Sequence, residues 1–189
     1  MPEIDQYGKD YRRAFKLAVK DGLAEAKQAH NMKALSLREP HAILTVTVRD
    51  GLALKQIETR SWFTSYRGPL LIHASKRFSV EEVYLCTQEP FLSALLNAGY
   101  GLPSMLPRGA IIGKVMLVGC HIILPIPSRC FGNDYEVTLP PPEPEHSFGD
   151  YTPGRYAWVF EEPVQFENPI PFSGQLGLFN VPDEVVPHG

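Results

Sequence analysis

One segment constrains the fold more than any other: residues 109–124, which read GAIIGKVMLVGCHIIL. The segment is long, apolar and rich in β-branched residues, and glycine recurs in it at positions 109, 113 and 119. Glycines inside such a run are typical of the bulges and bends of β-barrels. The segment therefore predicts a long, bent strand in a β-rich fold.

The rest of the chain predicts shorter strands and a few helices. Strands are expected at 33–37, 57–62 (or an extended loop there), 70–75, 155–160, 164–166 and 177–181. Helices are expected at 8–30, at 41–48 and from Ser79 to residue 97 with a break at Pro90, and Asp50-Gly51 is a turn signal. No Gly-rich phosphate loop follows a strand, which argues against Rossmann and P-loop folds. This order favours an α+β fold with a mixed, partly open β-barrel and flanking helices.

The chain is expected to form one domain with an extra N-terminal helix. Residues 1–31 predict an amphipathic helical extension, and a new pattern starts at Met32. Residues 32–189 form the main domain, with a Pro-rich insertion near 125–150 that we expect to be a loop or irregular segment. The N-terminal helix is expected to pack outside the barrel, and the alternative is a helix that binds a protein partner.

Composition limits the classes of partner. The formal net charge is −3, so the protein is no general binder of polyanions, and a nucleic-acid role needs a local basic patch. No apolar run approaches the roughly 20 residues that span a bilayer, and the N-terminus is polar, so we expect a soluble, cytoplasmic protein without a membrane partner. The three cysteines form no CxxC pair, and neither a metal nor another cofactor is expected.

Reactive side chains are densest between residues 55 and 76. In an extended segment Glu58, Arg60 and Trp62 share one face, while Ile57 and Thr59 share the face that contributes to the core. Cationic groups at such a place bind phosphate or carbonyl oxygens, a carboxylate accepts from an exocyclic amine, and aromatic rings stack on bases. Candidate ligand-binding residues are Arg60, Trp62, Tyr66, Arg67, Ser75, Lys76 and Arg155. A salt-bridge cluster that pins a loop to the barrel is an equally weighted alternative.

Several ordered motifs resemble the ASCH domain, a family of the PUA-like group. They cover roughly residues 32–181, most of the chain, and they read ALSLREP at 34–40, KQIETRSW at 55–62, YRGPLLIHASK at 66–76, GAIIGKV at 109–115, GRYAWVF at 154–160 and GQLGLF at 174–179. The resemblance implies a PUA-like β-barrel with a cleft for RNA. By motif, that cleft is implied to contain Lys55, Glu58, Arg60, Lys76 and Arg155.

The resemblance also implies possible activities, because one branch of the family resembles N4-acetylcytidine amidohydrolases and other members are described as ribonucleases. In the amidohydrolase pattern a threonine stands three residues after the lysine, whereas this chain has Glu58. A glutamate is an acid or base and not a hydroxyl nucleophile. Catalysis here would therefore use Lys55 and Glu58 as proton-transfer groups.

Three hypotheses follow. The first is a module whose charged cleft binds RNA or a modified nucleoside. The second is a hydrolase that acts on a modified nucleoside or on RNA. The third is a protein-interaction scaffold in RNA metabolism or transcription, with the N-terminal helix and the Pro-rich loop as contact surfaces.

Overall fold

The computed structural model describes residues 31–132 and 135–186. The helix predicted at 8–30 lies outside these residues. Backbone contacts divide the chain into a unit of residues 33–179 and a second unit made of both chain ends. The first unit contains both cavities discussed below and is described by itself. Within the described ranges, no helix is long and apolar enough to cross a membrane.

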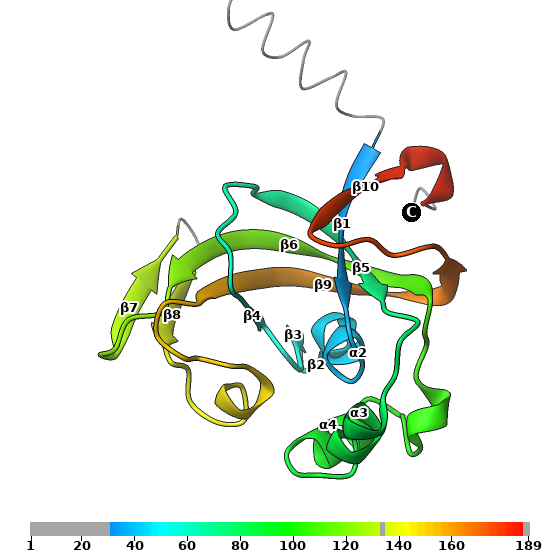
Figure 1. The fold of residues 1–189 in the computed structure, drawn as a ribbon, viewed down its shortest axis with the longest axis horizontal. Coiled ribbons are helices and arrows are strands. Elements are labelled where there is room, and N and C mark those ends of the chain that lie inside the picture. The colour runs from blue at the N-terminus through cyan, green and yellow to red at the C-terminus, as the bar shows by residue number, and fades with distance from the viewer. Residues whose placement is uncertain (1–30, 133–134, 187–189) are drawn as a thin grey trace, which may run out of the picture. The chain divides into compact units, whose positions relative to one another are not determined.

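A mixed, six-stranded sheet dominates the fold (Figure 1). Its strand order is β10-β1-β5-β6-β9-β4; β1 runs parallel to β5, and the β5–β6, β6–β9 and β9–β4 pairs are antiparallel. The strands are β1 (Asn31–Leu37), β4 (Ile57–Arg60), β5 (Gly68–Ala74), β6 (Ala110–Ile122), β9 (Tyr156–Pro171) and β10 (Leu178–Pro182). The α+β class predicted from the sequence is confirmed. The expected barrel does not close in the described residues, because the strand order ends in β10 on one side and in the four-residue β4 on the other.

Strand β6 is long and bent, as its glycines predict, and its partner β9 is long as well. Their pairing shifts register three times, including between Ile111 and Gly113, and β5 shifts once against β6. A Cβ at Gly113 would lie 2.3 Å from the Val164 carbonyl oxygen, so only glycine fits there. The separate strand predicted at 164–166 is wrong, because β9 continues through it. A positive φ of 48° at Glu162 lets the strand bend and go on.

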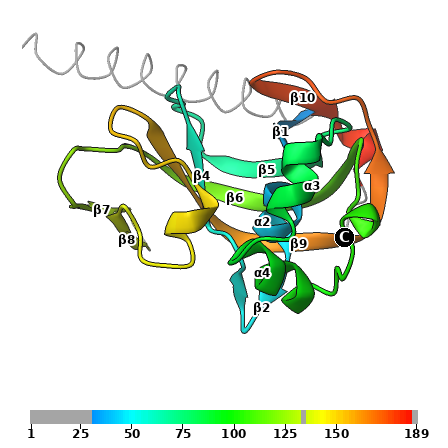
Figure 2. The same ribbon diagram turned by 60° about the horizontal axis from the view of Figure 1, so that its bottom comes forward.

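Helix α2 (His41–Val46) packs against β5, β6 and β9, and five of its six residues are buried. The helix forms despite its β-branched residues, because the free energy gained by burying their side chains outweighs their weak helix propensity. Figures 1 and 2 both show α2 between the long strands and α4 (Phe91–Asn97). The core cluster contains Leu44, Ile72 and Trp158 together with Phe91.

The turn predicted at Asp50-Gly51 joins β2 (Val48–Arg49) to β3 (Leu52–Ala53). Both turn residues have positive φ, 51° and 85°, which the type I′ hairpin requires. Helix α3 (Val80–Leu85) begins at Ser79 with a capping box in which the Glu82 carboxylate accepts the Ser79 N–H, and the predicted break at Pro90 separates α3 from α4.

The Pro-rich insertion is not wholly irregular, contrary to the prediction. It contains an antiparallel hairpin of β7 (Ser128–Phe131) and β8 (Glu136–Leu139). These two segments alternate in burial, and the prolines stand outside them, where no ladder hydrogen bond is lost. The 3-10 helix η2 (His146–Phe148) follows β8 and leads into a loop beside β4.

Candidate functional site

Three charged side chains around β4 form a chain of ion pairs. Lys55, just before the strand, is fully buried, and its Nζ donates to Glu58 Oε2 at 2.9 Å and to the Ile57 carbonyl oxygen. Glu58 Oε1 lies 3.2 Å from Arg60 Nε, and Arg60 Nη2 donates to the Ser36 carbonyl oxygen at 3.0 Å. The alternation predicted for this strand is confirmed, because Ile57 is buried in the core while Glu58 and Arg60 point the other way.

Glu58 is held as a carboxylate between two cations. Burial alone would raise its pKa, but the Lys55 ammonium and the Arg60 guanidinium together bring the pKa below its ordinary value. Its side chain stays 14% exposed. A carboxylate has about four lone-pair directions, so the two ion pairs leave room for a further donor.

Glu58 lines a cavity of about 340 Å³ that combines two carboxylates, those of Glu58 and Asp150, with several rings. Its wall comes from β4, α2, α3, α4, η2 and the loop after η2. The lining residues are His41, Glu58, Thr59, Leu85, Phe91, Ser147, Phe148, Gly149 and Asp150. The Phe91 ring meets His41 edge-on at 5.2 Å and Phe148 at 5.0 Å between centroids. The site therefore offers a charged acceptor next to aromatic surface.

His41 contributes a further polar group to this cavity. Its Nδ1 is buried and has no hydrogen-bond partner among the described residues. Burial, reinforced by the nearby Lys55 charge, lowers its pKa to about 4, so the imidazole is neutral at physiological pH. Buried polar atoms are nearly always hydrogen-bonded, and a ligand in the cavity would supply the partner.

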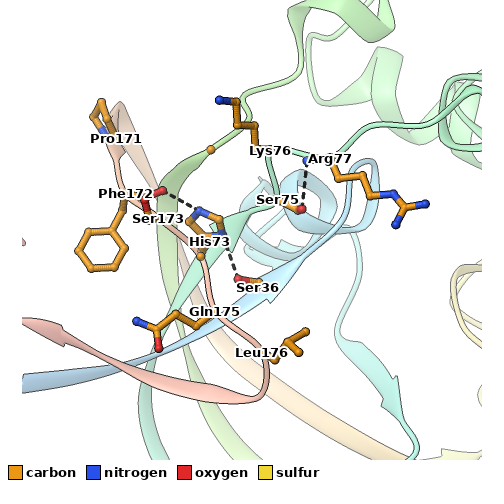
Figure 3. A pocket seen from close by; sticks show the side chains of 12 residues that line it. Ser36, His73, Ser75, Lys76, Arg77, Pro171, Phe172, Ser173, Gln175 and Leu176 are labelled. Atoms are coloured by element: carbon orange, nitrogen blue, oxygen red, sulfur yellow. Dashed lines mark hydrogen bonds between the residues drawn. The ribbon is translucent and has the colours of Figure 1, made fainter.

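Two other candidates from the sequence, Ser75 and Lys76, line a second and larger hollow (Figure 3). Its volume is about 1050 Å³, and it lies between the ends of β1 and β5 and the segment that follows β9. Ser36 also lines this hollow. Arg60 links the walls of the small cavity and the large hollow. It pairs with Glu58, which lines the small cavity, and donates to the backbone of Ser36, which lines the large hollow.

Five predicted ligand-binding residues line neither cavity: Arg60 and Arg155, which contact residues of the cavity walls, and Trp62, Tyr66 and Arg67. Trp62 is partly buried: it packs edge-on against the buried Trp158 at 4.6 Å, and its backbone carbonyl oxygen accepts the Trp158 indole N–H. The Tyr66 hydroxyl donates to the Pro69 carbonyl oxygen. Arg67 donates to the Thr64 and Tyr66 carbonyl oxygens at 3.0 and 2.7 Å. The hydrogen bonds of Tyr66 and Arg67 therefore stabilise the turn before β5.

Arg155 shapes the small cavity from outside. Its Nε lies 3.3 Å from an Asp150 carboxylate oxygen, and its Nη2 donates to the Thr59 carbonyl oxygen at 3.3 Å. Both partners line the cavity. On the other side, Glu145 accepts the backbone N–H groups of Gln56 and Ile57 at 2.7 and 3.1 Å. These contacts fix the loop of residues 145–150 against β4.

His41, Phe91, Phe148 and Asp150 are not among the site residues predicted from the sequence. His41 and Phe91 carry no local motif, and Phe148 and Asp150 lie at the end of the segment expected to be irregular. Neither a scan against protein-family models nor a search of curated proteins finds a match for this chain. Within residues 31–132 and 135–186, no group of three or more His, Cys, Asp or Glu side chains is placed to hold a metal ion.

Proposed function

We propose that the small cavity binds the base of a modified nucleoside or of an unpaired RNA nucleotide. The observation that carries this proposal is the Glu58 carboxylate, held by Lys55 and Arg60 at the wall of a ring-lined cavity. A fixed carboxylate accepts from the exocyclic amine of cytosine or adenine, and rings such as Phe91 offer apolar surface to the base. The neutral His41 supplies a further hydrogen-bonding atom.

We also propose that the chain is an ASCH-type domain with a PUA-like fold. The segments that carry the resemblance converge on the two cavities. The segment of residues 34–40 contributes Ser36, the segment of residues 55–62 contributes Glu58, and the segment of residues 66–76 ends at Lys76. Motifs far apart in sequence therefore line two cavities, and Arg60 joins them through its contacts with Glu58 and Ser36.

The position of Lys55 supports binding over hydrolysis. Its ammonium group is fully buried and engaged by Glu58 and by the Ile57 carbonyl oxygen. A general base must reach the proton that it removes. Lys55 instead orients Glu58 and sets its charge, which is the role of a positioning residue in a binding site.

The test is a titration of the purified protein with cytidine, uridine, modified nucleosides and short unpaired RNAs at low salt, followed by calorimetry. We expect cytidine-type ligands to bind more tightly than uridine, because uridine lacks the exocyclic amine. Glu58→Gln removes the charge and keeps the shape, and a lost charge-assisted hydrogen bond of about 1.5–3 kcal/mol weakens binding by about 10- to 150-fold. The matched control is Glu167→Gln on the exposed part of β9.

Equal affinities of wild type and Glu58→Gln would refute the proposed base readout. Mass spectrometry of the same mixtures reports turnover. Conversion of any ligand by the wild type, abolished in Lys55→Ala, would favour the hydrolase instead.

A further inference from the structure

The large hollow contains a second polar arrangement that nucleoside binding in the small cavity does not use. Strands β1 and β5 run parallel with Ser36 opposite His73. The Ser36 Oγ and the His73 Nδ1 are 3.0 Å apart, and both residues line the hollow. Figure 3 shows the imidazole between Ser36 and the backbone of Phe172.

The hydrogen bonds assign the tautomer of His73. Its Nε2 lies 3.0 Å from the Phe172 carbonyl oxygen, which can only accept, so Nε2 carries the hydrogen. The lone pair of a neutral imidazole then lies on Nδ1, and the Ser36 hydroxyl donates to it. Burial lowers the pKa of His73, which keeps the ring neutral. A hydroxyl, a base within hydrogen-bond reach and a third group that orients the base are the parts of an activated serine.

The segment after β9 passes close to the Ser36–His73 pair at Gly174. A Cβ at Gly174 would lie 2.5 Å from both Ser36 Oγ and His73 Nδ1 and 2.4 Å from His73 Cε1. Any side chain at this position would therefore displace the pair. Ser36 is partly exposed and lines the hollow, whereas His73 is only 2% exposed, so the base is shielded from bulk water.

The hollow also has a cation for a charged substrate. Lys76 is exposed, lines the hollow and forms no ion pair with any residue of the described ranges. Its ammonium group favours a substrate with a carboxylate or phosphate group. A volume of about 1050 Å³ is at the upper end for small-molecule sites.

We propose that Ser36 and His73 form an acyl-transfer site, separate from the nucleoside cavity, that hydrolyses small anionic esters. The Ser36 oxygen attacks the ester carbonyl carbon while its proton passes to His73 Nδ1, and the carbonyl electron pair moves onto its oxygen. The electron pair then re-forms the carbonyl double bond, and the ester C–O bond to the leaving group breaks. The leaving alkoxide takes the proton from His73 Nδ1 and departs as the alcohol. Water then attacks the acyl-serine by the same route, which yields the carboxylic acid and restores Ser36.

The experiment uses the full chain and p-nitrophenyl acetate as an acyl donor, with peptide mass spectrometry to locate the acetyl group. We expect an acetyl adduct on Ser36 and loss of that adduct in Ser36→Ala. In His73→Gln the adduct should form about 100-fold more slowly, the lower end of what a general base contributes. Ser65→Ala is the matched control, because Ser65 is exposed and lines neither cavity.

A second variant keeps the test interpretable if His73→Gln does not fold. Gly174→Ala keeps both reactive residues and obstructs the Ser36 oxygen, so the adduct should be lost while thermal unfolding shows a folded protein. The Ser36–His73 hydrogen bond also links β1 to β5, and a purely structural link would give no adduct. Absence of a Ser36 adduct in the wild type, or equal labelling of Ser36 and Ser65, overturns the proposal. Neither outcome affects the nucleoside titration, which depends on Glu58.

Discussion

Glu39 is a buried acid whose ionisation should control stability near neutral pH. It is 0% exposed, its Oε2 accepts the Ile43 N–H at 3.0 Å, and its Oε1 has no hydrogen-bond partner among the described residues. Burial raises its pKa from the ordinary 4.5 to about 8, although the Ile43 N–H and the charge of Arg108 oppose the shift. We predict that Glu39→Gln, which keeps the shape and the acceptor, becomes progressively more stable relative to wild type as pH rises.

The sign follows from proton binding. Between pH 4.5 and about 8 the folded protein keeps the Glu39 proton that the unfolded chain has lost, so the free energy of unfolding falls as pH rises through this window. For each pH unit of increase well inside this window, the free energy of unfolding falls by about 1.4 kcal/mol. From pH 5 to pH 7 this decrease sums to about 2.5 kcal/mol. Cys86, whose own pKa is raised to about 11 by burial and then by Glu39, does not titrate in this range.

The assay is urea unfolding of both proteins at pH 5, 6 and 7, with Glu167→Gln as an exposed control. The difference between Glu39→Gln and wild type isolates this one group, because the other titrating residues are common to both. A difference that stays constant across the three pH values would show that Glu39 is ionised when folded and would refute the reasoning.

Four further variants test the backbone and the ion pairs. Gly113→Ala places a Cβ 2.3 Å from the Val164 carbonyl oxygen, so we expect a loss of about 3 kcal/mol in chemical unfolding. A Cβ at Gly51 would meet open space, but the φ of 85° is strained for alanine, so Gly51→Ala should lower the free energy of unfolding by about 1 kcal/mol. Gly101 also has open space and no positive φ, so Gly101→Ala is the control and should lower it by less than about half of that. Lys55→Met removes a buried partner of Glu58; we expect a loss of about 3 kcal/mol and a rise of the Glu58 pKa in an NMR titration. An unchanged Glu58 pKa would contradict the role given to Lys55.

Local rules predicted most of the elements. Period-two alternation placed Ile57 inward and Glu58 outward, the glycines of β6 indicated its bulges, and Pro90 marked the gap between α3 and α4. These features depend on neighbours in sequence, so a pattern of a few residues is enough. The β7–β8 hairpin was missed because its strands are four residues long and stand among prolines.

The site was predicted only where its residues share one motif. Lys55, Glu58 and Arg60 lie within six residues, and the structure joins them as a chain of ion pairs. Trp62 has the same spacing, yet it packs on Trp158, because the strand ends at Arg60 and the alternation no longer applies. The rings of the cavity come from α2, α4 and η2, which meet only through tertiary packing, and the Ser36–His73 pair depends on the register of β1 against β5. A linear sequence pattern contains neither kind of information.

The short strand β4 stands at an open edge of the sheet, a position where proteins risk pairing with copies of themselves. Here the Ile57 N–H is taken by Glu145, and the Thr59 carbonyl oxygen is taken by Arg155. A foreign strand would have to displace both before it could add to the sheet. The loop that shapes one wall of the cavity therefore also guards the protein against aggregation, and substitutions of Glu145 or Arg155 would affect solubility as well as binding.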